Sequence, residues 1–371
     1  GKIVYAIIME QFNSSHGLLP AQMIRALIAQ GAIAADALLT EAQIQPASLD
    51  LRLGNCAWRV RASFLPGAGG SVEEKLARFS LHRIDLAGGA VLETGCVYLA
   101  PLAERLALPA VISAAANPKR STGRLDVYTR VIADGAASFD QVSAGYHGQL
   151  YAEICPQTFP VLVRTGSRLA QIRFRRGEVA ATDQALAALH LQEGLVSGDA
   201  ADIAGGIALS ADLSGGENGV IGYRAKRHTG VVDVDLEAAC DIADYWEPIT
   251  ARDRRLILDP DEFYILASRE AVHVPPTHAA EMVPFNPLVG EFRVHYAGFF
   301  DPGFGHAASG GSGARAVLEV RSHKVPFMLE DGQIVGRLNY ERLIEPPEAL
   351  YGARPGSHYQ AQGLKLSKHF K

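Results

Sequence analysis

An internal repeat at an offset of 166 residues constrains the fold of this chain more than any other feature of its sequence. The stretch Val97–Pro109 reads VYLAPLAERLALP, and Phe263–Pro275 reads FYILASREAVHVP. The identities at this offset pair Tyr98 with Tyr264, Glu104 with Glu270, Pro109 with Pro275, Glu153 with Glu319, Pro160 with Pro326 and Gly166 with Gly332. Chance identities would scatter over many offsets, so these matches indicate a tandem duplication. Between the blocks the register breaks, because the first half has extra residues around 136–141 and the second has a Gly/Ser loop around 306–313.

Runs of strand length, bounded by Gly, Pro, Asn or Asp, fill both halves. They include Cys96–Leu99, Gln149–Ile154, Arg168–Phe174, Glu262–Leu266 and Ala316–Val320. Together with 37 Gly and 19 Pro, they predict a mainly β fold, a sandwich or distorted barrel with a few short helices. The spacing of apolar residues predicts helices at Leu19–Gln30 and Gln184–His190.

The length of 371 residues fits two domains of the typical size of about 150 residues. We expect an N-terminal domain at 17–178, an Ala- and Gly-rich linker at 179–206 and a C-terminal domain at 207–371. The short apolar stretch Ile3–Met9 cannot span a membrane and lacks a signal-peptide cleavage pattern. We assign no function to it.

The composition of the chain indicates which binding partners to expect. The chain carries 35 Lys and Arg against 40 Asp and Glu, a net charge of −5, so neither nucleic acid nor a membrane is expected as a partner. Any phosphate site must then be a local pocket. The four cysteines are far apart and form no C-x-x-C pair, which predicts neither disulfides nor a zinc site and favours the reducing cytoplasm.

A cationic turn, NPKRSTGRL at Asn117–Leu125, is the first candidate site. Lys119, Arg120, Ser121 and Arg124 surround a glycine just after a proline. Such a turn can direct guanidinium groups, a hydroxyl and backbone N–H groups toward phosphate oxygens. The alternative is a solvated basic loop.

A second candidate is a glutamate on a predicted strand, AVLEV at Ala316–Val320, which follows the segment DPGFG at Asp301–Gly305. Glu319 is flanked by apolar residues, and burial in an apolar interior would raise its pKa toward the range of a general base. An outward-facing glutamate on an ordinary strand is the alternative. The repeat favours the first interpretation, because Glu153 occupies the same place in the first half.

The tail YGARPGSHYQAQG at Tyr351–Gly363 is the third candidate. Its aromatic and amide side chains could close over a bound ligand, or it could be a disordered polar tail.

These motifs together resemble the dCTP deaminase family, within the wider dUTPase-like group of nucleotide hydrolases. The resemblance rests on IQPASLDLRLGN at Ile44–Asn55, the Arg/Ser turn, the DPG segment followed by a glutamate, and the Tyr/Gln tail. It extends from the leading helix to about Phe174 and again from about Leu256 to the C-terminus. It implies two tandem dUTPase-like domains of the β-clip, distorted-barrel type.

The resemblance also implies roles for individual residues. In the family's turn R-S-S-x-x-R, Lys119 stands for the first Arg, Arg120 for the first Ser, and Ser121 and Arg124 match. The catalytic glutamate corresponds to Glu153 and Glu319. The small residue whose carbonyl holds the attacking water corresponds to Ala133 and Ala297.

The resemblance also implies residues that contact the sugar and base of the nucleotide, and residues of the closing tail. Further nucleotide-binding positions are Asp301, Gly303, Phe304, Val317, Leu318, Tyr351, His358 and Gln362. The first half has Ser143 in place of the DPG aspartate, and His358 stands where the family has Lys. The second half has no Arg/Ser turn at Val283–Gly290. In the family each site forms between neighbouring subunits, so we expect a homo-oligomer with sites between domains. One complete site would join the first-half turn to Asp301, Glu319 and the tail.

The implied reaction is hydrolytic deamination of dCTP to dUTP and ammonia, with Glu319 as general base. The chain lacks the H-x-E and P-C-x-x-C pattern of zinc deaminases, so no zinc and no protein-held metal is expected. Magnesium would accompany the triphosphate. Two alternatives remain open. One is a dUTPase, or a bifunctional enzyme that also releases pyrophosphate from dUTP. The other is a nucleotide-binding or assembly protein without catalysis, favoured by the altered motif in each half.

Overall fold

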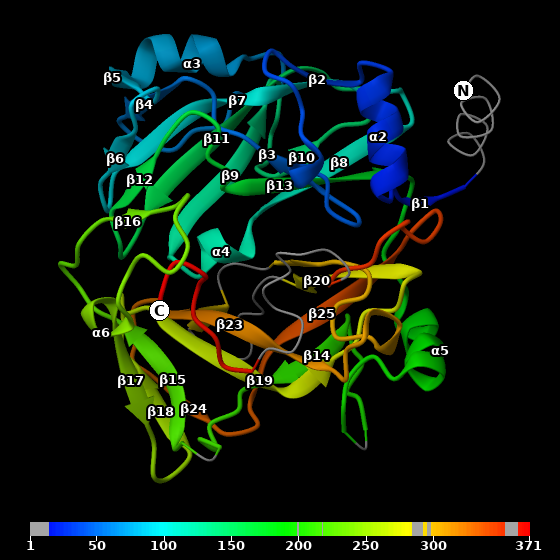
Figure 1. Cartoon of the computed structure of the whole chain (residues 1–371), viewed down its shortest axis with the longest axis vertical. Coiled ribbons are helices and arrows are strands. Elements are labelled where there is room, and N and C mark those ends of the chain that lie inside the picture. The colour runs from blue at the N-terminus through cyan, green and yellow to red at the C-terminus, as the bar shows by residue number, and fades with distance from the viewer. Residues whose placement is uncertain (1–14, 199, 217, 284–291, 295–297, 353–362) are drawn as a thin grey trace.

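A computed structural model describes the chain except residues 1–14, 199, 217, 284–291, 295–297 and 353–362. Two β-rich halves lie one above the other in Figure 1, with short helices at their margins. The helices of the first half are α2 (Ala21–Ala29), α3 (Val72–Phe79) and α4 (Arg120–Gly123), and those of the second are α5 (Asp183–Glu193) and α6 (Ile242–Tyr245). Among the described residues no helix has the length and apolarity needed to cross a bilayer.

The strands of the first half form two larger sheets and one small one. They are β1 (Gly17–Leu18), β2 (Ile33–Ala35), β3 (Leu49–Leu51), β4 (Cys56–Val60), β5 (Ser80–Asp85), β6 (Ala90–Leu92), β7 (Val97–Ala107), β8 (Ile112–Pro118), β9 (Val127–Ala133), β10 (Gln141–Val142), β11 (His147–Pro156), β12 (Val161–Val163) and β13 (Ala170–Arg176). One sheet has the order β1-β13-β8-β10, with β3 also on β13. Another has the order β5-β4-β7-β11-β9, with β2 also on β7.

The second half repeats this plan. Its strands are β14 (Ile207–Ser210), β15 (Val220–Ala225), β16 (Val232–Asp233), β17 (Trp246–Thr250), β18 (Arg255–Leu258), β19 (Tyr264–Val272), β20 (His278–Val283), β21 (Phe292–Val294), β22 (Phe299–Phe300), β23 (Ala314–Ser322), β24 (Phe327–Glu330) and β25 (Ile334–Arg342). The sheet orders are β14-β25-β20-β22, β17-β15-β19-β23-β21 and β18-β24. The predicted mainly β fold is confirmed.

Hydrogen bonds repeat at the offset seen in the sequence. Glu153 lies opposite Leu99 in the β11–β7 register, and Glu319 lies opposite Ile265 in the β23–β19 register. The repeated tyrosines both accept a hydrogen bond through their hydroxyl, Tyr98 from a backbone N–H at 3.0 Å and Tyr264 from another at 2.9 Å.

The other repeated glutamates also share a structural task. Glu104 accepts the backbone N–H of Arg52 at 2.8 Å, and Glu270 accepts that of Ser210 at 2.8 Å. The repeat therefore preserves the bonds that hold each unit together, since a buried polar group without a partner costs stability.

The hydrophobic core of the first half extends into the second half. Phe159 of the first half packs against Tyr245, Trp246 and Phe370, with ring centroids 5.5, 5.3 and 6.0 Å away. The strand β16 pairs in parallel with β12, so a segment of the second half extends a sheet of the first. This interlocking fixes the position of each half relative to the other.

The segment 179–206, expected as the linker, packs into the second half. The predicted helix is present as α5, which begins after Thr182 and ends at the left-handed Gly194. Leu186, Leu195 and Val196 are buried in the core of the second half. The predicted helix near the N-terminus is also present, as α2, whereas Ile3–Met9 lies outside the described residues.

Candidate functional site

The cationic turn lies where the two halves meet. Strand β8 ends at Pro118, and a single helical turn, α4, follows directly. Figure 1 shows α4 at the lower edge of the first half, facing the second half. Ser121 and Arg124 are buried. A solvated basic loop, the alternative considered above, does not fit this burial.

Arg124 faces Glu319 across the boundary between the halves. Its Nε lies 3.7 Å from Oε1 of Glu319, and both side chains are almost fully buried. Burial raises the pKa of Glu319 to about 7, although the nearby Arg124 and Arg120 oppose that shift. Glu319 is therefore poised to take up a proton near neutral pH.

A small cavity of about 10 Å³ adjoins this pair. Its lining includes Val317, Glu319, Arg120 and Arg124. Such a volume is close to the minimum, on the order of 10–15 Å³, that one water needs. Leu318 packs in the core of the second half, because successive side chains of a strand point to opposite faces. Any contact of Leu318 with a ligand in this cavity would thus run through its backbone.

Arg120 ties the turn to the second half. Its Nε and Nη2 donate to the carbonyl of Phe299 at 3.2 and 3.0 Å. Its guanidinium also lies 4.2 Å from the ring centroid of Phe300 and 4.5 Å from that of Phe304. Burial lowers the pKa of Arg120. A cation thus occupies the place of the family's serine and is held by aromatic faces.

The DPGF segment forms the wall beside Arg120. The carboxyl of Asp301 is buried, and this burial raises its pKa while Arg173, at 3.7 Å, opposes the shift. Gly303 has a φ of +94°, and a Cβ there would lie 2.8 Å from the side chain of Leu350. Only glycine fits this backbone without strain. The ring of Phe304 packs against that of Tyr351, with centroids 5.6 Å apart.

A polar pocket of about 390 Å³ opens next to these residues. It is lined by Lys119, Arg120, Ser121, Asp301 and Tyr351 among the predicted residues, and also by Asp50, Arg168, Gln171, Glu237 and Lys368. Five side chains singled out from the sequence therefore share one pocket. His358 and Gln362 lie outside the described residues.

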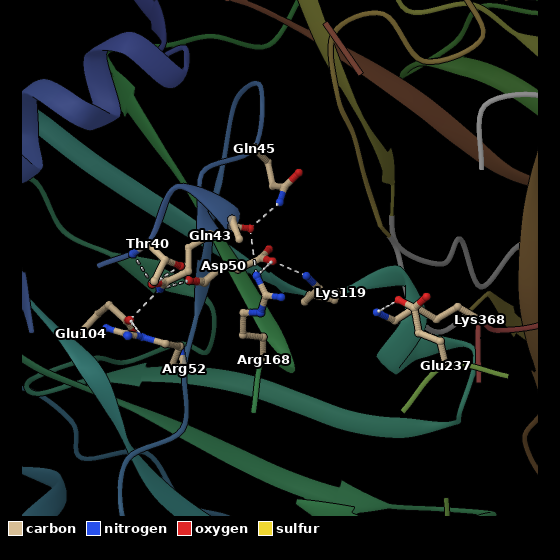
Figure 2. A network of polar contacts seen from close by, with 11 residues as sticks. Thr40, Gln43, Gln45, Asp50, Arg52, Glu104, Lys119, Arg168, Glu237 and Lys368 are labelled. Carbon is tan, nitrogen blue, oxygen red and sulfur yellow. Dashed lines mark hydrogen bonds and ion pairs between the residues drawn. The ribbon is translucent and has the colours of Figure 1, made fainter. Parts of the chain in front are cut away.

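Charged side chains in this pocket are already paired with one another. Figure 2 shows Asp50 between Lys119 and Arg168, with Lys368 and Glu237 nearby. Asp50 contacts the Nζ of Lys119 and lies 3.4 Å from Nη1 of Arg168. Lys368 and Glu237 are 2.9 Å apart.

Sequence reasoning did not assign a role to these pocket residues. Asp50 stands within the quoted stretch Ile44–Asn55, but nothing in its spacing indicates that it meets Lys119, which is 69 positions away. Arg168 begins a predicted strand, and Lys368 stands between two other lysines, Lys365 and Lys371. The sequence held no signal that separates them from other surface cations.

The equivalent glutamate of the first half has different surroundings. Glu153 accepts a hydrogen bond from the hydroxyl of Ser63 at 2.5 Å. Burial raises its pKa, while the bond from Ser63 and the charge of Arg130 oppose the shift. Ala133 lies on β9 opposite Leu150 of the same sheet, so it belongs to this first-half region. Its predicted counterpart Ala297 is outside the described residues.

The structure thus places a buried carboxylate, an arginine and a cation-lined pocket on a duplicated β framework. The β framework is that of the dUTPase-like fold class. Two family models match, described as the 2'-deoxycytidine 5'-triphosphate deaminase N-terminal domain, at residues 15–178, and C-terminal domain, at residues 182–370. The chain belongs to the dCTP deaminase family.

Individual relatives agree with the family. A crystal structure of 2'-deoxycytidine 5'-triphosphate deaminase from Agrobacterium tumefaciens is 64% identical, with a TM-score of 0.85, over 88% of this chain and 99% of that one. A "dCTP deaminase, dUMP-forming" of Coprothermobacter proteolyticus is 29% identical over 42% of this chain and 81% of its own length. A "dCTP deaminase" of Haloarcula marismortui is 30% identical over 36% of this chain and 66% of its own length.

Proposed function

We propose that this chain deaminates dCTP to dUTP and ammonia at the Glu319 site. The observation that carries the proposal is the buried contact of Glu319 with Arg124 beside a cation-lined pocket. Membership of the dCTP deaminase family supports it.

The chemistry follows from the geometry. Water enters the small cavity beside Glu319, and the carboxylate takes one of its protons as the oxygen attacks C4 of the cytosine ring. The carboxyl passes this proton to ring N3, then takes the remaining proton of the added hydroxyl and delivers it to the departing amino group. The C4–N bond breaks, ammonia leaves, and the C4 oxygen remains as the carbonyl of the uracil ring. Arg124 and Ser121 stabilise the charge that develops in the tetrahedral intermediate. Water and dCTP are consumed in equal number to give dUTP and ammonia.

Lys119, Arg168 and Lys368 supply positive charge for the triphosphate. In the structure they are neutralised by Asp50 and Glu237, so phosphate oxygens would exchange for these carboxylates as partners. Arg120, Asp301, Phe304 and Tyr351 are proposed to contact the sugar and base.

Magnesium is proposed to enter with the triphosphate. The described residues hold no group of three or more His, Cys, Asp or Glu suited to a metal ion, and Asp50 and Glu237 are engaged by cations. Phosphate oxygens and water therefore fit as its ligands, as is common for this ion.

The assembly and the compartment are also proposals. The residues of the Glu319 site come from both halves of a single chain, and we propose that whole chains associate further into a homo-oligomer. All four cysteines are free thiols, which supports a reducing compartment such as the cytoplasm.

A bifunctional enzyme that also cleaves dUTP is the second candidate. It is favoured by relatives named "dUMP-forming", such as that of Coprothermobacter proteolyticus. Incubation with dCTP and magnesium separates the candidates. Ammonia with dUTP supports the first, ammonia with dUMP and pyrophosphate supports the second, and nucleotide binding without ammonia would refute both and favour a non-catalytic protein.

A further inference from the structure

A second ion pair crosses between the halves next to the Glu319 site. Arg321 follows Glu319 by two residues on β23, and Asp126 follows Arg124 by two residues. The Nη2 of Arg321 contacts Oδ2 of Asp126, and its Nε donates to Oδ1 at 3.2 Å. Two ion pairs therefore connect the halves side by side. The first half supplies the cation of the Arg124–Glu319 pair and the anion of the Asp126–Arg321 pair.

The second pair is fixed more rigidly than a surface salt bridge. Asp126 is completely buried and the side chain of Arg321 is 11% exposed. The hydroxyl of Thr158 donates to Oδ2 of Asp126 at 2.5 Å and lies 3.0 Å from Nη2 of Arg321. Nη1 of Arg321 donates to the carbonyl of Asp261 at 2.8 Å. Two contacts to the carboxylate and these further bonds define one orientation for the guanidinium.

The backbone also points to Asp126 as a special residue. Its φ is +59°, in the left-handed region that Asp and Asn adopt more readily than most other residues. Its N–H donates to the carbonyl of Gly123 at 3.0 Å, and its carbonyl accepts from the N–H of Gln157 at 2.9 Å. These bonds anchor the end of the cationic turn at the point where Arg321 contacts it.

If this ion pair were broken, the side chains of Asp126 and Arg321 would each have another charged partner close by. Side chains two residues apart on a strand point to the same face, roughly 7 Å apart. A released Arg321 could therefore reach Glu319 and compete with Arg124. In the same way, an Asp126 without Arg321 is two residues from Arg124 and could draw it away from Glu319.

We propose that the Asp126–Arg321 ion pair is a positioning device that keeps Arg321 off Glu319 and leaves Arg124 as the partner of the catalytic carboxylate. The inference rests on the proposed deaminase function. It assigns to Asp126, Arg321 and Thr158 a role in the reaction without contact to the nucleotide.

Among the residues that the structure describes, the other groups around Glu319 do not supply this control. The turn contributes the cations Arg124 and Arg120, and the neighbouring β19 contributes the apolar Ile265. The lining of the small cavity adds the uncharged Met282, Val294 and Phe300. On the neighbouring strand β21, Arg293 is paired in the sheet register with Arg321 and not with Glu319.

The pH profile of ammonia release provides the test. Asp126→Asn keeps the left-handed backbone but frees Arg321, so the acid limb of kcat/KM should move to lower pH by about one unit. Arg321→Gln frees Asp126 to compete for Arg124, so the limb should move to higher pH by a similar amount. Both variants should lower kcat about tenfold or more with little change in KM. The double variant should return the limb close to its wild-type position.

Matched controls separate positioning from stability. Arg164→Gln breaks another ion pair between the halves, with Asp233 at 2.8 Å, and should lower the melting temperature without moving the limb. Arg321→Lys keeps a cation for Asp126 and should keep the wild-type limb.

Every outcome of this experiment either supports the proposal or overturns it. Opposite shifts that cancel in the double variant support the proposal. Unchanged profiles, shifts of the same sign, or a lysine variant that behaves like the glutamine variant would overturn it. If Arg321→Gln does not fold, Arg321→Met replaces it, because it keeps the apolar stem of the side chain and also frees Asp126. A limb at higher pH then supports the proposal, and an unchanged limb overturns it. A wild-type chain that releases no ammonia from dCTP refutes the proposed function instead.

Discussion

The two repeated glutamates, Glu319 and Glu153, occupy the same place in the two halves and yet have different surroundings. Glu319 faces a buried arginine from the other half. Glu153 accepts a hydrogen bond from Ser63 of its own half. Burial raises the pKa of both carboxyls. Burial is thus common to both carboxyls. The cationic turn beside Glu319 distinguishes this proposed catalytic glutamate from Glu153.

This difference shows how a duplication can specialise its copies. A neutral hydroxyl bound to Glu153 satisfies a buried carboxyl, which serves stability. An arginine beside Glu319 can in addition stabilise charge that appears during the reaction. On the proposed function, the first half supplies the turn to the second half and keeps Glu153 as a structural glutamate.

The largest expected effect comes from exchanging each glutamate in turn. Glu319→Gln should lower kcat for ammonia release by about 10²–10⁴-fold, the contribution typical of a general base. Glu153→Gln is the matched control and should stay within about twofold of wild type. Loss of turnover in the Glu153 variant alone would invert the assignment.

The pH dependence should follow the buried Glu319 carboxyl. Burial raises its pKa to about 7, and the base works only when deprotonated. We expect kcat/KM to fall about tenfold per pH unit below that value, measured by ammonia release with buffers matched in ionic strength. A profile flat down to pH 5 would show that this carboxyl does not control the reaction.

A smaller effect is expected at Arg120. Arg120→Met retains bulk but loses the bonds to Phe299 and the contacts with two aromatic rings. We expect KM for dCTP to rise about tenfold, because charge-assisted bonds contribute on the order of 1.5–3 kcal/mol. Arg120→Lys, which retains the charge, should fall between wild type and the methionine variant. An unchanged KM in both would leave Arg120 without a role in binding.

The smallest effect should come from Ser63. Ser63→Ala removes the hydrogen bond to Glu153 and should lower the free energy of unfolding by about 1 kcal/mol, measured by urea denaturation. Turnover of dCTP should not change. A loss of activity larger than the loss of folded protein would mean that the first-half glutamate also acts in the reaction.

Local patterns in the sequence predicted a large part of the fold. The repeat, the strands around Glu153 and Glu319, and helices at the positions of α2 and α5 follow from spacing that a single segment carries. A site that joins Arg124 of the first domain to Glu319 of the second was also expected, and the two side chains lie 3.7 Å apart.

The remaining features depend on contacts between distant segments. Asp50 meets Lys119 and Arg168, and Arg321 meets Asp126, across 69, 118 and 195 positions. No periodicity reports such pairs, because each partner alone is an ordinary charged residue. The packing of 179–206 was missed for a similar reason. Its Ala and Gly content suggests a connection, whereas Leu186, Leu195 and Val196 are buried by strands far along the chain.

The aromatic cluster around Phe159 has a consequence for biosynthesis. Trp246 and Phe370, which pack on this ring, are translated long after Phe159 itself. N-terminal domains usually fold first as they leave the ribosome, but here the first half cannot complete its interior until residues more than 200 positions downstream have emerged. The duplicated gene product must therefore finish folding as one unit, late in synthesis, and a nascent chain halted between the repeats would leave an apolar surface open to chaperones.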